Sequence, residues 1–192
     1  GDVEVYPADE FLVQVAARFE DFEDFGSTFN YKLATNYRVN DGLALRGSVS
    51  TGFRAPTPGQ SNAFNVSTEF DIALGDLVNN GTIPATNPVA LLFGGEALDP
   101  EESLNITAGA IMETGPVTLT IDFFDIRLED RISVSQLFSI NDLSADQLQD
   151  LINAGVTSAE NLQNFRFFTN DFDTKTTGVD VVATTSLDFD AG

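Results

Sequence analysis

The sequence predicts an all-β fold of antiparallel up-and-down strands, joined by short turns at one end and long loops at the other. Six segments alternate between apolar and polar residues, as strands with one apolar and one polar face do. Two connections are tight turns, and two are long segments that contain most of the prolines. Because successive antiparallel strands reverse direction, both long connections leave the sheet at the same end.

The alternation places six strands along the chain. The predicted strands cover residues about 11–22, 28–39, 42–54, 103–114, 117–131 and 174–187. In the third strand the apolar residues Leu43, Leu45 and Val49 lie on one face. Arg46 and Ser48 lie on the other face. Each strand is therefore expected to separate an apolar environment from a polar one.

Turn signals separate these strands. The first turn, residues 23–27, is polar and includes Gly26, which can adopt a positive φ. Asn40-Asp41-Gly42 is a strong hairpin signal, and Thr114-Gly115-Pro116 predicts another tight turn. These turns pair the strands as hairpins.

The segments 56–102 and 133–165 interrupt the alternation and are predicted to be long loops. The second contains a short helix, with Ser144 as N-cap and Gln147 as the reciprocal residue of a capping box. Gly155 can end that helix. Loops of this length are unusual in compact soluble domains but are typical of the outer side of large outer-membrane barrels.

Composition excludes several classes of function. The chain has no Cys and no His, and so lacks a thiol nucleophile, the commonest metal ligand and the commonest general base. Nine basic residues against 30 acidic ones give a net charge of −21, which excludes a nucleic-acid partner. No residue constellation supports catalysis or a cofactor site, so the chain is predicted not to be an enzyme.

The hydropathy pattern is compatible with a membrane barrel. No apolar run approaches the ~20 residues that a membrane-spanning helix needs. Barrel strands need only about 9–11 residues, of which alternate ones are apolar. The chain opens on acidic residues at Gly1 rather than on a signal peptide, so we expect an internal piece of a longer chain.

Residues 46–56 contain Arg-Gly-Ser followed by Thr-Gly-Phe-Arg-Ala-Pro, a string that resembles a barrel strand of TonB-dependent outer-membrane receptors. Five further motifs resemble those of this family in the same order. Residues 17–27 are similar to a hairpin tip of the family, and Lys32-Leu33 is similar to a residue pair in one of its strands. Residues 98–103 read Leu-Asp-Pro-Glu-Glu-Ser, and residues 122–126 read Asp-Phe-Phe-Asp-Ile. The segment 170–180 begins with Asn and ends with Gly-Val-Asp.

The resemblance implies that residues 1–192 are a fragment of a large transmembrane β-barrel in the outer membrane of a Gram-negative bacterium. Six strands cannot close a barrel of about 22 strands. The implied function is TonB-energised uptake of a scarce nutrient: an iron chelate, cobalamin or an oligosaccharide. The implied partners are outer-membrane lipid, a small nutrient ligand, and the receptor's own plug domain and TonB, both outside this segment.

On such a wall, the odd-numbered residues of the first three predicted strands face lipid and the even-numbered ones face the lumen. The lumen-facing candidates are Arg18, Lys32, Arg46 and Arg54. They either contact plug or substrate or form a solvated charge ladder. In the fifth predicted strand the alternation changes phase at Phe124, which predicts a bulge or a strand leaving the bilayer.

The long loops are acidic. Residues 56–102 contain seven acidic residues and no Lys or Arg, and residues 133–165 contain four acidic residues and no basic one. This predicts capture of a cationic or neutral ligand, calcium-assisted loop closure, or simply a solvated acidic surface. It argues against a strongly anionic ligand held by these loops alone. Four aromatic residues either stack on a ligand or pack the loops: Phe64, Phe70, Phe93 and Phe138.

An alternative fold accounts for the alternation equally well. In a soluble secreted β-sandwich, one face of each sheet is also buried. Such a protein would bind a glycan or calcium. It fits the two long Pro-rich connections less easily.

Overall fold

The computed structural model of the 192-residue chain describes residues 1–22, 26–72 and 75–186. The chain divides into two compact units. Unit 1 comprises residues 1–54, 102–129 and the segment from 173 onward, and unit 2 comprises residues 55–101 and 130–172.

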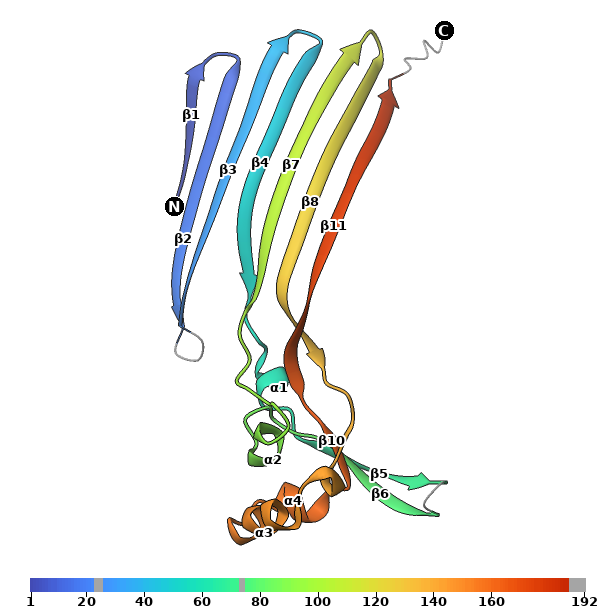
Figure 1. The fold of residues 1–192 in the computed structure, drawn as a ribbon. Helices are drawn as coiled ribbons and strands as arrows, with labels where there is room; N and C mark the ends of the chain where they lie inside the picture. Colours follow the sequence, from blue (N-terminus) through green and yellow to red (C-terminus); the bar gives the residue numbers. More distant parts are fainter. Residues whose placement is uncertain (23–25, 73–74, 187–192) are drawn as a thin grey trace, which may run out of the picture. The chain divides into compact units, whose positions relative to one another are not determined.

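Unit 1 is built on a seven-stranded sheet in the order β1-β2-β3-β4-β7-β8-β11 (Figure 1). Its strands are β1 (Asp2–Ala8), β2 (Phe11–Phe22), β3 (Gly26–Asn40), β4 (Leu43–Arg54), β7 (Glu101–Thr114), β8 (Val117–Val134) and β11 (Phe168–Thr185). All six predicted segments form strands. The predicted end of the last strand at Leu187 lies outside the described residues.

The edge strand β1 is an addition to the six predicted strands. Its seven residues, Asp-Val-Glu-Val-Tyr-Pro-Ala, include two acids and a proline, and all of them are exposed. Such a sequence gives only a short alternation, with Val3 and Val5 as its apolar residues. The strand forms because Val3 and Val5 pair with Val15 and Val13 of β2.

The tight turns have the local chemistry that the sequence predicts. The side chain of Asn40 accepts a hydrogen bond from the backbone N–H of Gly42 at 2.9 Å, which is an Asx-type turn. Gly26 and Gly115 adopt φ values of 83° and 57°, a region that favours glycine. Both predictions of a hairpin, at 40–42 and 114–116, are confirmed by the pairing of the strands on either side.

The ladder between β7 and β8 runs without a register shift from Glu102↔Glu129 to Thr114↔Val117. The prediction of a bulge near Phe124 is therefore wrong. The apolar pattern changes there because Asp125 and Arg127, rather than apolar residues, follow Phe123 on the same face.

Unit 2 corrects the prediction of two separate long loops, the second with a short helix, since the two insertions fold together. Its sheet has the order β5-β6-β10-β9, and β6 and β10 pair in parallel, Asn80 opposite Asn164. Its elements are α1 (Pro58–Ser61), β5 (Asn65–Asp71), β6 (Asp76–Thr82), α2 (Pro88–Leu91), β9 (Phe138–Ser139), the 3₁₀ helix η1 (Ile140–Asp142), α3 (Ala145–Asn153), α4 (Thr157–Asn161) and β10 (Asn164–Arg166).

This unit has its own hydrophobic core. Ile83, Val89 and Phe165 are fully buried, and residues from both insertions pack around them. The predicted capping box of α3 is confirmed: the Ser144 hydroxyl accepts from the Gln147 N–H, and the Gln147 side chain accepts from the Ser144 N–H. Among the described residues, no helix combines the length and hydropathy that crossing a bilayer requires.

Candidate functional site

The sheet of unit 1 carries an apolar belt, which we define as the large apolar side chains on the odd-numbered face of β2, β3 and β4 and the matching face of β7, β8 and β11. Val15, Leu33 and Val49 lie side by side in it across β2, β3 and β4. Val15 and Leu33 are 48% and 42% exposed. Exposed apolar side chains at this density mark a surface that contacts something other than water.

The belt runs diagonally across the strands. It ends at Phe19 on β2, whereas on β8 it ends at Phe123, before Asp125. Phe123 of β8 pairs with Ala108 of β7. Following the pairing of neighbouring strands from β7 through β4 and β3 to β2, the residue of β2 in the same row as Phe123 is Val13.

The offset gives the strand tilt. Between β8 and β2 the border of the belt therefore shifts by six residues, from Val13 to Phe19, which is about 20 Å along the strand. The four strand spacings between β8 and β2 add up to about 19 Å across the sheet. A level border then requires strands tilted by about 45°, close to the 35–45° of transmembrane barrels.

The opposite face of the same sheet is polar and carries the predicted lumen-facing residues. Lys32 and Arg46 line a shallow hollow of about 370 Å³ together with Gln14, Asn36 and Ser48. Arg18 makes an ion pair with Glu20 on its own strand at 2.6 Å. Arg54 is the last residue of β4. The structure thus brings Lys32 and Arg46 together and places Arg18 and Arg54 nearer the loop end of the sheet.

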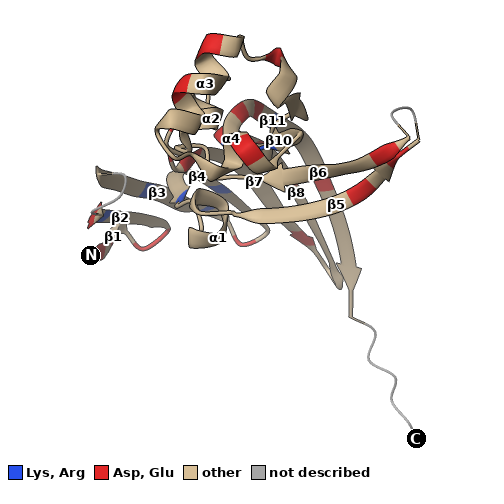
Figure 2. Cartoon of the chain, turned by 90° about the horizontal axis from the view of Figure 1, so that it is seen from below, with Lys and Arg blue, Asp and Glu red and all other residues tan. Residues whose placement is uncertain are grey.

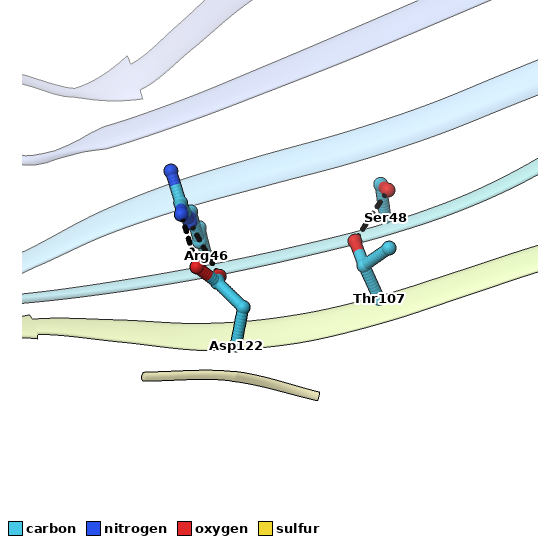
Figure 3. A network of polar contacts seen from close by, with 4 residues as sticks. All are labelled: Arg46, Ser48, Thr107 and Asp122. Carbon is cyan, nitrogen blue, oxygen red and sulfur yellow. Dashed lines mark hydrogen bonds and ion pairs between the residues drawn. The ribbon is translucent and has the colours of Figure 1, made fainter. Parts of the chain in front are cut away.

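Arg46 is held by a carboxylate two strands away (Figure 3). Its Nε donates to Asp122 Oδ1 at 2.8 Å and its Nη2 to Oδ2 at 2.5 Å, a bidentate pair. Asp122 lies on β8 and pairs with Gly109 of the intervening strand β7. A Cβ at Gly109 would lie 2.0 Å from Asp122 Oδ1, so only glycine lets the carboxylate cross β7. Beside the pair, the Ser48 and Thr107 hydroxyls are 2.8 Å apart.

Substituting Gly109→Ala is therefore expected to displace Asp122 and to break its pair with Arg46. We expect a loss of unfolding free energy of about 1–3 kcal/mol, the range of overpacking substitutions. Gly47→Ala on β4 is the matched control, because its Cβ would meet Thr107 O and Thr35 Oγ1 at ordinary contact distances of 3.5 and 3.9 Å. Guanidinium titration of the refolded receptor measures both; equal stabilities would contradict the crossing role of Gly109.

Two of the resembling motifs meet in unit 2 and form a clamp. The side chain of Asn170 donates to the backbone oxygens of Asp99 and Asp130 at 2.9 and 2.6 Å and accepts from the Asp99 N–H at 2.9 Å. The buried carboxylate of Glu101 accepts from the N–H of Ile132 at 2.8 Å. Asp130 adopts a φ of 53°, a strained value for a residue other than glycine. These motif residues therefore hold backbone in place.

The four aromatic loop candidates separate into two kinds of position. Phe93 and Phe138 contact each other and Phe165, with ring centroids 5.0–5.7 Å apart, and so pack the core of unit 2. Phe64 and Phe70 are 60% and 61% exposed. Ligand contact by any of the four stays a prediction, and the exposed pair is the one a ligand can reach.

A polar pocket in unit 2 was not predicted from the sequence. It has a volume of about 210 Å³ and is lined by Asn65, Ser67, Glu69, Asn80, Thr82 and Arg166, among others. Glu69 accepts from the Asn80 amide at 3.2 Å, and Arg166 donates to the Thr82 hydroxyl at 3.4 Å. Short polar strands give no sequence signal for such a pocket, because its residues lie on two strands whose paired positions, such as Asn80 and Asn164, are 84 residues apart in the chain.

Unit 2 is acidic over several elements. Figure 2 marks Asp and Glu positions in red on the ribbon of α3, α4, β5 and β6. Its basic residues in the described part of the chain are Arg131 and Arg166. No group of three or more acidic side chains among the described residues is arranged to hold a metal ion.

A tilted sheet with an exposed apolar belt outside and a polar hollow inside defines the wall of an outer-membrane β-barrel. Comparison with known proteins agrees with this class: all residues, 1–192, match the family model described as TonB dependent receptor-like, beta-barrel. The chain belongs to this family of transport receptors, which are not enzymes and which lie in the outer membrane of Gram-negative bacteria. No curated protein matches the sequence. The soluble β-sandwich alternative is thereby wrong, since unit 1 contains a single sheet whose belt is uncovered within it.

Solved structures show the same fold. The siderophore receptor PirA from Pseudomonas aeruginosa aligns with a TM-score of 0.66 at 14% identity, over 94% of this chain and 29% of that one. PirA from Acinetobacter baumannii gives 0.62 at 16% identity, over 96% and 24%. A point mutant of the ferric enterobactin receptor PfeA of P. aeruginosa, in complex with enterobactin, gives 0.63 at 11%, over 93% and 23%. The chain thus spans less than a third of these receptors.

Proposed function

We propose that this chain forms part of the wall and the outer loop layer of a receptor that takes up a small nutrient ligand with energy delivered through TonB. The tilted sheet, apolar on one face and polar on the other, carries this proposal. The apolar belt contacts outer-membrane lipid. The polar face, with Arg18, Lys32, Arg46 and Arg54, lines the lumen, where a plug domain elsewhere in the full receptor packs against it.

The ligand we favour is an iron chelate without a strong negative charge. The similar solved receptors are named for siderophores, which supports an iron chelate over cobalamin or an oligosaccharide. The acidity of unit 2 opposes a strongly anionic ligand. The polar pocket beside Arg166 offers carboxylate, amide and hydroxyl groups to the hydroxyls and amides of such a chelate.

Uptake tests the proposal directly. The full receptor, expressed in a Gram-negative host that lacks siderophore receptors, is expected to confer accumulation of a radiolabelled neutral ferric siderophore. Deleting TonB in the host removes accumulation but leaves cell-surface binding, because binding does not need energy. Accumulation that continues without TonB contradicts the proposal. Uptake of cobalamin or an oligosaccharide instead would keep the transport function and reject the iron chelate.

The pocket is tested by a matched pair of substitutions. Arg166→Ala is expected to weaken binding of the transported ligand by about tenfold, the effect of losing one charge-assisted hydrogen bond. Arg131→Ala in the same unit removes a guanidinium that instead lies over the Phe172 ring, 5.3 Å from its centroid. Equal affinities of the two variants in equilibrium binding would remove this pocket from the ligand site.

A further inference from the structure

Strand β5 is a free edge of the sheet of unit 2. It comes first in the order β5-β6-β10-β9, so its one neighbour in the described part of the chain is β6. The two strands form a hairpin that projects from the helices of this unit (Figure 1). Residues 65–70 of β5 are all exposed. The strand therefore offers its backbone edge to another chain.

The backbone groups that face this edge follow from the contacts of β6. The N–H of Asn79 donates to the Gln163 side chain at 2.6 Å, and its C=O accepts from the Gln163 N–H at 3.0 Å. Both groups thus point away from β5, where Thr68 is the residue paired with Asn79. In an antiparallel ladder the two residues of such a pair point their backbone groups away from each other. The N–H and C=O of Thr68, and those of Val66 and Phe70, therefore face the free edge.

The side chains along this edge divide into an apolar face and an acidic face. Val66 and Phe70 lie on one face, and both are exposed. Ser67 and Glu69 lie on the other face, in the lining of the polar pocket, and Asp71 continues that face. The Glu69 carboxylate accepts from an amide at 3.2 Å and from a hydroxyl at 3.5 Å, and neither group neutralises its charge.

Charge is the feature of this edge that selects its partner. The sequence of β5 contains no Pro and no Lys, and its ladder with β6 runs without a register shift from Asn65↔Thr82 to Asp71↔Asp76. The edge therefore lacks the bulges and prolines that commonly prevent strand addition. Glu69 and Asp71 oppose pairing with a second copy, because the copy would bring the same carboxylates. They favour a strand that carries basic residues.

We propose that β5 binds an extended segment of a separate, basic protein by strand addition. The backbone of that segment pairs with Val66, Thr68 and Phe70. Its apolar side chains pack beside Val66 and Phe70, and its alternate Lys or Arg side chains lie beside Glu69 and Asp71. The backbone hydrogen bonds give affinity, and the alternation of apolar and basic residues gives selectivity. The inference uses unit 2 alone and is independent of the proposed uptake.

A decapeptide that alternates Lys and Val tests this surface on the full receptor. In fluorescence anisotropy, we expect it to bind at least about tenfold more tightly than a decapeptide with the same residues in one Lys block and one Val block. Equal binding of the two peptides would mean non-specific charge attraction and would overturn the proposal.

Hydrogen exchange of the full receptor locates the bound peptide. Amides of β5 are expected to exchange more slowly when the alternating decapeptide is bound, because their outward N–H groups gain partners. If these amides are already as protected as those of β6 without peptide, another part of the receptor covers the edge. That result also overturns the proposal.

A proline at the centre of the edge tests strand addition itself. Thr68→Pro removes an N–H that faces the partner and none that pairs with β6, so the hairpin is expected to remain. Thr68→Ala is the matched control, because it removes the same hydroxyl and keeps the N–H. We expect Thr68→Pro to bind the alternating decapeptide about tenfold more weakly than Thr68→Ala does. Equal affinities overturn the proposal.

The basic character of the partner is tested with Glu69→Gln, which also covers a failure of Thr68→Pro to fold. This change is expected to weaken binding of the Lys-Val decapeptide about threefold, the effect of losing one exposed ion pair. It should leave binding of a decapeptide that alternates Gln and Val unchanged. Equal effects on both peptides overturn the basic partner. Self-association of the receptor that Thr68→Pro abolishes would make a second copy the occupant, and this too overturns the proposal.

Discussion

Phe165→Ala is expected to lower the local stability of unit 2 by about 3–5 kcal/mol, the cost of removing a fully buried Phe. Phe165 is 0% exposed and packs against the rings of both Phe93 and Phe138, with centroid distances of 5.0 and 5.7 Å. It also belongs to β10, which pairs with β6 on one side and β9 on the other. Its loss therefore leaves a cavity at the point where both insertions meet.

Hydrogen exchange of the full receptor measures this effect region by region. Backbone amides of β6, β10 and α3 are expected to exchange faster in Phe165→Ala, while those of β2 and β3 keep their protection, because the units have separate contacts. Phe70→Ala is the control, since Phe70 is 61% exposed and its loss is expected to stay within about 0.5 kcal/mol. Exchange that accelerates equally in both variants would mean that unit 2 has no independent core.

Much of the sheet could be predicted from the sequence because each strand has one apolar and one polar face. Alternation alone locates β2, β3 and β4, and the turn Asn40-Asp41-Gly42 identifies β3 and β4 as a hairpin. The capping box that begins with Ser144 locates α3 in the same local way. These signals lie within a few residues of each other, so no knowledge of distant pairing is needed.

The fold of unit 2 could not be predicted, because its sheet depends on non-local pairing. β9 and β10 have two and three residues, too few to show a period, and β10 pairs in parallel with β6 across 84 positions. Its core includes Phe165 and Ile83, which come from different insertions. Only the tertiary structure brings them together.

The polar site was predicted in part. Alternation places Arg46 on the polar face, but its partner Asp122 depends on the register of β4 against β7, which a long insertion separates. The same holds for Gly109, whose missing side chain makes room for the pair.

Leu33→Arg is expected to destabilise the receptor in a bilayer by about 2–4 kcal/mol, the cost of a guanidinium on the lipid face near the midplane. Leu33 lies at the middle of the belt on β3 and is paired with Val15 on β2 and Val49 on β4. Neither neighbour is acidic, so neither can neutralise the new guanidinium. Ala34→Arg, one residue along the same strand, places the same charge on the polar face beside Gln14 and Ser48. We expect this control to cost less than about 1 kcal/mol, because water solvates the lumen.

The depth of the substituted residue in the bilayer provides a second, independent test of this prediction. Phe19→Arg lies on the same face as Leu33 but at the border of the belt, where the cost is expected to fall to about 0–1 kcal/mol. Unfolding free energies of the full receptor in liposomes should thus rank Leu33→Arg far above both Phe19→Arg and Ala34→Arg. A sheet buried against protein would instead penalise Phe19→Arg and Leu33→Arg alike, because a protein core has no depth gradient. Equal costs for Leu33→Arg and Ala34→Arg would contradict the assignment of lipid and lumen faces.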